Sequence, residues 1–290
     1  MAAAATAILV MRNSLGQNYS RGVELTRTDL ARILPKKTPY TLIPSTVFRA
    51  SAPDGAVSTV ALSECERMLR STNELGHNHS VFVGGDHLTS MCTVLASLKV
   101  HGNNFRLLWL DAHADIHSPE TSPSNNSHGM VVNMLINHTY AGIPRLLPNQ
   151  IMYVGLRSTE PAEDEFIRRW KIRTITSREF LKNEMSSMRN IAAFAKDANV
   201  HVSLDIDVLD PSVMRATATP SPSPGGLHLD QLMHILGTVE SAAGNYYATD
   251  IMEYNPKKCA DAGSMAAAGE RDAAASIQTM RTIFGFLTGN

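Results

Sequence analysis

Four apolar runs of the sequence end in residues whose side chains can bind a metal ion or move a proton. These residues are His87 in GGDH, Asp111, His113 and Asp115 in DAHAD, Asp205 and Asp207 in SLDID, and Glu253 in DIME. Residues at positions i and i+2 of an extended chain point to the same side, so each group is expected to present its side chains together. In an open parallel sheet, the carboxyl ends of the strands border the crevice where ligands bind. We therefore expect these residues to surround one point.

The proposed cluster of four aspartates and two histidines predicts a specific chemistry. So many polar groups in a buried crevice are costly unless cations compensate them. Six donors dominated by carboxylate oxygen exceed the four of a closed zinc site and suit a pair of octahedral ions such as Mn²⁺. Two ions about 3.5 to 4 Å apart can ionise a bridging water near neutral pH. Singly, D-x-D or GGDH is also common in turns and helix caps, so the hydrolase prediction depends on the combination.

The elements that must position these residues alternate along the chain. Short apolar runs predict strands at 6–11, 79–85, 105–111, 150–156, 201–207 and 246–253. Between them, helices are expected at 58–76, 88–100, 161–170, 185–198, 229–243 and 264–287. This alternation is typical of an α/β protein, and it predicts a single three-layer αβα domain over residues 1–290 with a mainly parallel sheet. Two segments rich in Ser, Pro, Asn or Gly, 116–129 and 215–227, predict long functional loops.

Composition narrows the classes of function. The chain has 290 residues, 43% of them hydrophobic, and a net charge of −1, which favours a globular protein without a nucleic-acid or membrane partner. No apolar run reaches the roughly 18 to 20 residues that cross a bilayer. Three cysteines without C-x-x-C spacing favour a reducing, cytoplasmic location. The first residues, MAAAATAILVMR, lack a charged leader region and are expected to form a strand rather than a targeting segment.

The combined motifs resemble those of arginases, the dimanganese enzymes of the ureohydrolase family. The resembling blocks are GGDH (84–87), DAHADIHSPETSPSNNSHGM (111–130), SLDIDVLDP (203–211), TATP with the later GGL (217–227) and MEYNP (252–256). RGVELTRTDL (21–30) and VGLR (154–157) extend the likeness over nearly the whole chain. The resemblance implies an arginase/deacetylase-like fold. It also implies hydrolysis of L-arginine to L-ornithine and urea through attack of a metal-bridging hydroxide on the guanidinium carbon.

The resemblance assigns a role to each matching residue. One manganese ion would be bound by His87, Asp111, Asp115 and Asp205, and the other by His113, Asp111, Asp205 and Asp207. Asp115 would also orient the hydroxide, and His128 would shuttle protons. Glu253 would hold the planar guanidinium, with support from Thr219.

The residues that would bind the rest of the substrate are less typical. Ser124 and Asn126 match positions that hold the α-carboxylate, and Glu160 matches an acidic position that recognises the α-amino group. His117, which would also bind the substrate, stands where arginases usually carry Asn. Further departures are Asn125 in place of Gly, Ser158 in place of Asp, Val208 in place of Gly, and about two extra residues after Thr219.

These departures leave the substrate open, and two further classes of protein are separate alternatives. The first alternative is a ureohydrolase for another guanidino compound, such as agmatine or a guanidino acid. The second is a non-catalytic arginase-like protein, and the third is a mononuclear zinc deacetylase of related fold. Family analogy further implies a homo-oligomer, either a trimer or a hexamer.

Overall fold

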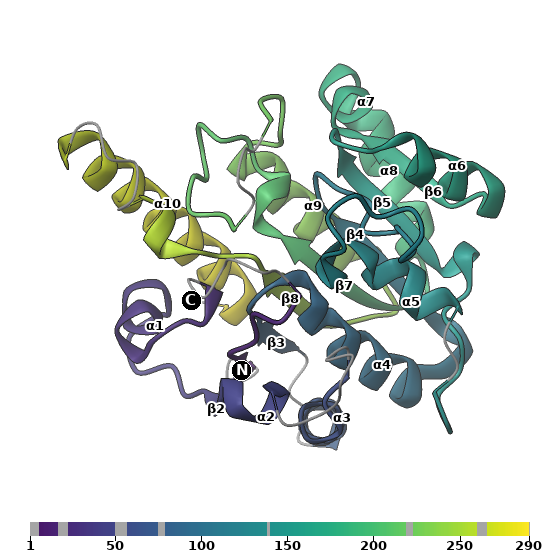
Figure 1. The fold of residues 1–290 in the computed structure, drawn as a ribbon, viewed down its shortest axis with the longest axis horizontal. Coiled ribbons are helices and arrows are strands. Elements are labelled where there is room, and N and C mark those ends of the chain that lie inside the picture. Colours follow the sequence, from purple (N-terminus) through teal and green to yellow (C-terminus); the bar gives the residue numbers. More distant parts are fainter. Residues whose placement is uncertain are drawn as a thin grey trace.

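All strands that the structure describes belong to one parallel sheet. The computed structural model describes residues 6–16, 23–49, 57–74, 79–137, 140–218, 223–259 and 266–289. The strands are β1 (Ala7–Met11), β2 (Thr41–Ile43), β3 (Ser80–Val83), β4 (Phe105–Leu110), β5 (Ile151–Leu156), β6 (Arg173–Thr176), β7 (Asn199–Asp205) and β8 (Asn245–Met252). Their order across the eight-stranded sheet is β2-β1-β3-β8-β7-β4-β5-β6, and every neighbouring pair is parallel (Figure 1).

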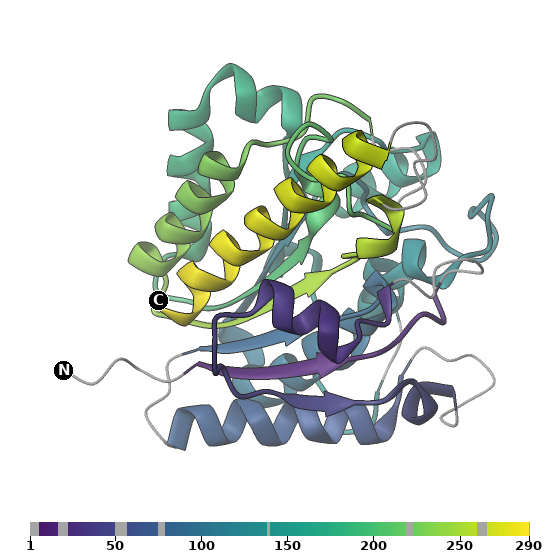
Figure 2. The same ribbon diagram turned by 90° about the vertical axis from the view of Figure 1, so that its left-hand side faces the viewer.

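Helices cover both faces of the sheet. They are α1 (Arg27–Ile33), α2 (Ser45–Arg49), α3 (Thr59–Glu74), α4 (Ser90–His101), α5 (Val131–Asn137), α6 (Pro161–Trp170), α7 (Ser177–Lys182), α8 (Glu184–Ala195), α9 (Leu229–Ala242) and α10 (Ala266–Thr288). One hydrophobic core joins the sheet to α1 and α7 to α10, and a second joins its other face to α2 to α6. In Figure 2 the yellow α10 and green α9 lie on one side of the strands and the blue α3 lies on the other. The predicted three-layer α/β arrangement is confirmed.

Burial on both faces explains why the central strands were visible as apolar runs. A strand covered by helices on both sides has no solvent face, so its residues are continuously apolar. β3, β4, β5 and β7 are buried along almost their whole length. The two edge strands, β2 and β6, were not predicted, because they are short and contain exposed or half-buried residues. The short helices α1, α2, α5 and α7 were also missed, since each has at most seven residues.

The strand order brings the candidate motifs together. β3, β8, β7 and β4 are consecutive neighbours at the centre of the sheet. Because these strands are parallel, their carboxyl ends lie at one edge of the sheet. GGDH, DIME, SLDID and DAHAD lie at these ends or directly after them. Within the ranges described above, no helix has both the length and the apolarity needed to span a membrane.

Candidate metal centre

Close backbone packing explains the two glycines that precede His87. The segment after β3 passes so near its neighbours that a Cβ on Gly85 would lie 1.5 Å from the Asn13 carbonyl oxygen. A Cβ on Gly84 would lie 1.8 Å from Met252 Sδ. The missing side chains let the chain turn directly into the short 3₁₀ helix η2 (His87–Thr89), which places the His87 ring in the interior with no exposed surface.

The aspartate motifs do not continue the strands as extended chain, so that part of the prediction is wrong. Beyond β4, Asp111 Oδ1 accepts a hydrogen bond of 2.7 Å from the His113 backbone N–H, and the chain bends at this point. Asp205 is the last residue of β7, and its Oδ1 accepts a 2.8 Å bond from the N–H of Asp207, which lies in the 3₁₀ helix η6 (Ile206–Val208). Asp115 has a positive φ of 49°. Local hydrogen bonds by the aspartates themselves therefore outcompete extended geometry.

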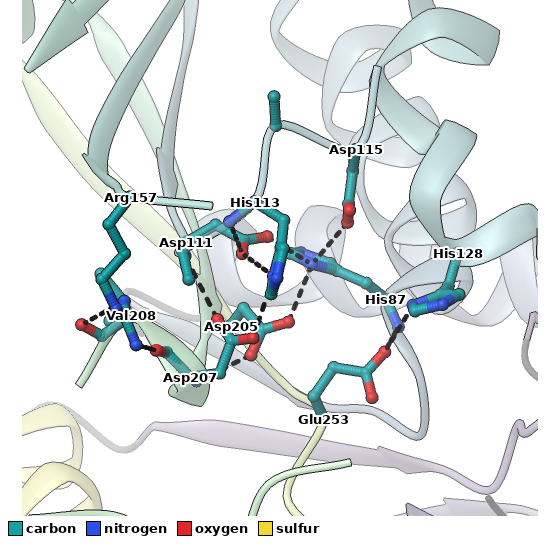
Figure 3. Close-up of polar contacts among 12 residues, drawn as sticks. His87, Asp111, His113, Asp115, His128, Arg157, Asp205, Asp207, Val208 and Glu253 are labelled. Carbon is teal, nitrogen blue, oxygen red and sulfur yellow. Dashed lines mark hydrogen bonds and ion pairs between the residues drawn. The ribbon is translucent and has the colours of Figure 1, made fainter. Parts of the chain in front are cut away.

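Three carboxylates nevertheless converge on the His87 ring. His87 Nδ1 lies 3.0 Å from Asp111 Oδ2, 3.2 Å from Asp115 Oδ2 and 3.4 Å from Asp205 Oδ2 (Figure 3). Nδ1 is buried but makes no hydrogen bond of acceptable geometry. A nitrogen surrounded by oxygens that it does not bond is the arrangement expected of donors that share a cation.

A second group of donors adjoins the first through Asp111. His113 Nδ1 lies 3.1 Å from Asp207 Oδ2 and 3.5 Å from Asp111 Oδ1. Asp111 therefore directs one oxygen toward each histidine, and its Oδ2 also accepts a bond of 3.0 Å from the Trp109 indole N–H. His87, Asp111 and Asp205 form one set with the spacing of metal ligands, and Asp111, His113 and Asp207 form another.

The electrostatics of the cluster show an excess of negative charge. Burial raises the pKa of Asp115, and the charge of Asp111 raises it further. The pKa of Asp205 is raised well above its usual value by burial and by Asp207 and Asp111. Burial lowers the pKa of His113, but Asp207 and Asp111 outweigh this and raise it to about 12. Divalent cations would relieve this repulsion, and four carboxylates with two imidazoles suit them chemically.

Glu253 and His128 lie together beside the cluster. Glu253 follows β8 in the left-handed region (φ 64°), and its N–H donates to the Gly85 carbonyl oxygen at 2.8 Å. Its Oε1 accepts a 2.8 Å bond from the His87 backbone N–H and lies 3.3 Å from His128 Nδ1. Although burial lowers the pKa of His128, the Glu253 carboxylate more than offsets this, and the pKa rises to about 9.

A cleft of about 370 Å³ opens onto this centre, within the range of roughly 300 to 1,000 Å³ that is typical of small-molecule sites. It is lined by His113, Asp115, His117, Ser122, Pro123, Ser124, Asn126, His128, Gly129, Ser158, Glu160, Glu163, Asp205 and Glu253. All the residues predicted to bind the substrate therefore line the cleft, apart from Thr219, which lies outside the described residues. His117 Nε2 lies 3.4 Å from Glu160 Oε2 and 3.8 Å from Glu163 Oε2.

Glu163 was not singled out in the sequence. It is the third residue of α6, and its Oε2 accepts a 3.0 Å bond from the Glu160 N–H, so it caps the helix. Burial raises its pKa to about 7. The spacing E-P-x-E at 160–163 was the available signal, but it indicates a helix start and carries no information about a cleft.

Val208, which stands where arginases usually carry a glycine, has room for its side chain because the neighbouring Gly155 has none. Gly155 has a φ of 97°, and a Cβ there would lie 2.3 Å from Val208 Cγ2. Arg157 donates to the Asp207 carbonyl oxygen at 2.6 Å and to that of Val208 at 3.3 Å, which fixes the turn that carries Asp207 (Figure 3). Valine at position 208 therefore leaves Asp207 within reach of His113.

With a three-layer parallel fold and acidic and imidazole donors at the carboxyl edge of its central strands, the protein is an α/β protein with a candidate metal centre. A sequence model of the Arginase family matches residues 22–277, so the chain belongs to the Arginase family. The hepatic arginase of Aquarana catesbeiana is 34% identical over 212 residues. That alignment covers 68% of this chain and 62% of the frog protein, so the match spans less than two thirds of that relative.

Solved structures support the same fold. The arginase of Entamoeba histolytica in complex with L-ornithine has a TM-score of 0.67 and 24% identity, covering 96% of this chain and 99% of that one. A putative agmatinase from Clostridium difficile has a TM-score of 0.72 and 17% identity, covering 99% and 98%. At these identities the likeness concerns the fold alone.

Proposed function

We propose that this protein is a ureohydrolase that binds two Mn²⁺ ions and hydrolyses L-arginine to L-ornithine and urea. The observation that carries the proposal is the convergence of two sets of metal-binding donors, joined by Asp111, in the same cleft as Glu253 and His128. A chain without a use for metal would gain nothing from this many buried, mutually repelling carboxylates. The resemblance to arginases and the family membership agree with this activity.

The six clustered residues would hold the two ions. His87, Asp111, Asp115 and Asp205 are proposed for one ion, and His113, Asp111, Asp205 and Asp207 for the other. When bound, such a pair supplies an activated water and electrostatic stabilisation of negative charge. The folded turns after β4 and β7 hold the donors in place before any ion arrives, because each turn is fixed by hydrogen bonds to the backbone.

Glu253 and His128 are proposed to handle the guanidinium group and its protons. A carboxylate can accept two parallel N–H bonds from the planar guanidinium, and Glu253 is buried and lines the cleft. His128 is less buried and lies 3.3 Å from Glu253, which suits a group that donates a proton to the leaving amine and recovers it from solvent. Asp115, which also lines the cleft, would orient the attacking water.

The outer part of the cleft is proposed to bind the amino-acid end of the substrate. Ser124, Asn126 and His117 offer hydrogen-bond donors for an α-carboxylate. Glu160, beside His117, offers a carboxylate for the α-ammonium group. The guanidinium would then lie at the metal centre and the tail at the mouth.

A second candidate is a ureohydrolase for a different guanidino compound, such as agmatine or a guanidino acid. Two glutamates, Glu160 and Glu163, surround His117 at the tail end, and no Lys or Arg is among the described residues that line the cleft. This charge balance favours an ammonium tail, as in agmatine, over the carboxylate tail of a guanidino acid. The likeness in fold to a putative agmatinase is compatible with it.

The decisive experiment is urea release from purified, Mn²⁺-loaded protein with arginine, agmatine and guanidino acids in parallel. We expect arginine to have the highest kcat/KM. A higher value for agmatine would select the second candidate. Binding of less than one manganese ion per chain together with no urea release would indicate a non-catalytic arginase-like protein. A single tightly bound zinc ion with amide cleavage would indicate a deacetylase.

The tail assignment predicts a selective effect of Glu160→Gln. This side chain is 52% exposed, so the substitution should hardly change stability. Loss of one charge-assisted contact should raise KM for arginine about tenfold, with kcat nearly unchanged. Steady-state kinetics test this, with Asp164→Asn as the control, because Asp164 lies in the same helix turn and bonds Thr159 rather than lining the cleft. Equal KM values for the two variants would contradict the assignment.

Location and assembly follow as further proposals. Cys65 and Cys92 are buried free thiols, which fits a reducing compartment such as the cytoplasm. A homo-oligomer, trimeric or hexameric, is proposed by analogy with arginases. Light scattering of the purified protein measures that state directly.

A further inference from the structure

A buried polar network lies behind His87, on the side of the ring that faces away from the acidic cluster. Its members are His87, Ser90, Thr93, Ser97, His201, Ser203 and Asp250, and each has 0% exposed surface. Asp250 lies at its centre, on β8. A buried carboxylate is costly unless donors satisfy it, so this arrangement must be compensated by its hydrogen bonds.

Asp250 collects hydrogen bonds from three hydroxyl groups. Its Oδ2 accepts from Thr93 at 2.7 Å, from Ser90 at 2.8 Å and from Ser203 at 3.2 Å. Its other oxygen, Oδ1, lies 2.9 Å from His201 Nε2. A carboxylate has no proton to give, so each hydroxyl hydrogen in these bonds points toward Asp250.

The direction of these bonds determines whether Ser203 donates a hydrogen bond to His87 or accepts one. Ser203 Oγ lies 3.1 Å from His87 Nε2. The single hydroxyl hydrogen of Ser203 is directed to Asp250 and is therefore not available to His87. Ser203 is therefore left as an acceptor, and the hydrogen between it and His87 belongs to Nε2. The opposite nitrogen, Nδ1, then keeps its lone pair for a metal ion.

The ring of His87 is held in place as well as oriented. The Trp109 indole stacks on it with 4.1 Å between ring centroids and 11° between planes. By contrast, the side chain of His113, the histidine of the second donor set, is 33% exposed. The histidine of one proposed ion position is therefore held more firmly by its surroundings than the histidine of the other.

We propose that Asp250 is a positioning residue which, through Ser203, fixes the His87 tautomer with an unprotonated Nδ1 and so tightens the binding of the ion that His87 holds. This rests on the proposed two-metal function. Outer partners of metal-binding histidines typically change metal affinity by roughly 10- to 100-fold when they are removed. The ion held by His113, which has no contact with this network in the described part of the chain, should be affected much less.

The test compares Mn²⁺ binding to wild-type protein and to Ser203→Ala by equilibrium dialysis with metal analysis. We expect one of the two ions to bind about 10- to 100-fold more weakly in Ser203→Ala. The urea-forming activity should return when Mn²⁺ is raised above the weakened Kd. Asp250→Ala should have the same effect, because it removes the acceptor of the Ser203 hydrogen, which can then be donated to His87 Nε2.

Thr93→Val is the matched control, since it also removes one buried hydroxyl donor from Asp250 but does not touch His87. It should bind both ions with affinities within about threefold of wild type, below the effect expected for an outer ligand partner. The proposal is overturned if Ser203→Ala binds both ions as tightly as wild type, or if Thr93→Val weakens binding equally. Wild-type protein that binds fewer than two ions would instead refute the two-metal site itself, and the positioning role with it.

Discussion

Replacing Glu253 by glutamine should lower kcat/KM for arginine about a thousandfold while leaving two Mn²⁺ ions bound. The amide cannot accept two N–H bonds from a guanidinium group, and its own NH₂ would face the substrate's donors without a partner. Such unpaired buried groups are severely penalised, and single electrostatic contacts in active sites are worth roughly 10²- to 10³-fold or more. Glu253 is not among the proposed ligands, so the metal content should be retained.

The structure makes this substitution more informative than truncation. Glu253 Oε1 accepts the His87 backbone N–H at 2.8 Å, and glutamine keeps an oxygen that can do the same. Glu253→Ala would remove that acceptor and disturb His87 directly. Kinetics and metal analysis on the same sample test the prediction, with Glu165→Gln on the exposed face of α6 as the control. Loss of metal in parallel with turnover would show that Glu253 supports the ions and not the substrate.

The central strands of the fold were predictable because each leaves its own run of apolar residues in the sequence. A strand covered on both faces is mostly apolar, and β3, β4 and β5 carry that signature along nearly their whole length. Their identity as neighbours was not predictable, because the sequence order of these strands differs from their order in the sheet. The convergence of the four motifs followed only from the general rule for the carboxyl ends of parallel strands.

The candidate site shows where reasoning from sequence fails. His113 and Asp207 were expected to continue the extended chain, but Asp111 and Asp205 each accept the backbone N–H two residues ahead, and the chain bends there. Ser203 and Asp250 lie within predicted strands, where a polar residue in an apolar run gives no sign of its partner. Asp250 meets Ser90 and Thr93 across 160 and 157 residues, and only the folded chain reveals those pairings.

The same repulsion that makes the acidic cluster suitable for metal should make the metal-free protein less stable than it could be. The pKa of Asp205 is raised by burial and by the charges of Asp207 and Asp111. A carboxyl group with a higher pKa in the folded state than in the unfolded state destabilises the fold as pH rises above its unfolded value, near 3.9. Metal-free Asp205→Asn lacks that charge, and its Oδ1 can still accept the Asp207 N–H.

We therefore expect the order of stability to reverse with metal. Without metal at pH 7, Asp205→Asn should be more stable than wild type by on the order of 1 kcal/mol or more, and the difference should vanish toward pH 4. With Mn²⁺ at 100 times the wild-type Kd, wild type gains about 2.7 kcal/mol per site and the variant, which has lost a shared ligand, gains little. Its kcat should fall about a thousandfold or more, equivalent to about 4 kcal/mol.

Urea denaturation in EDTA and in Mn²⁺ measures both halves of this prediction, and Asp210→Asn serves as the control. Asp210 is also an aspartate that accepts backbone N–H bonds, but its pKa is lowered to about 2 although burial opposes this, because Ser212, Gly225 and Gly226 donate to it. Removing its charge should destabilise the protein equally with and without metal. If Asp205→Asn behaved like this control, Asp205 would be a structural residue. The carboxylates around His87 would then not be a metal site whose repulsion a bound cation relieves.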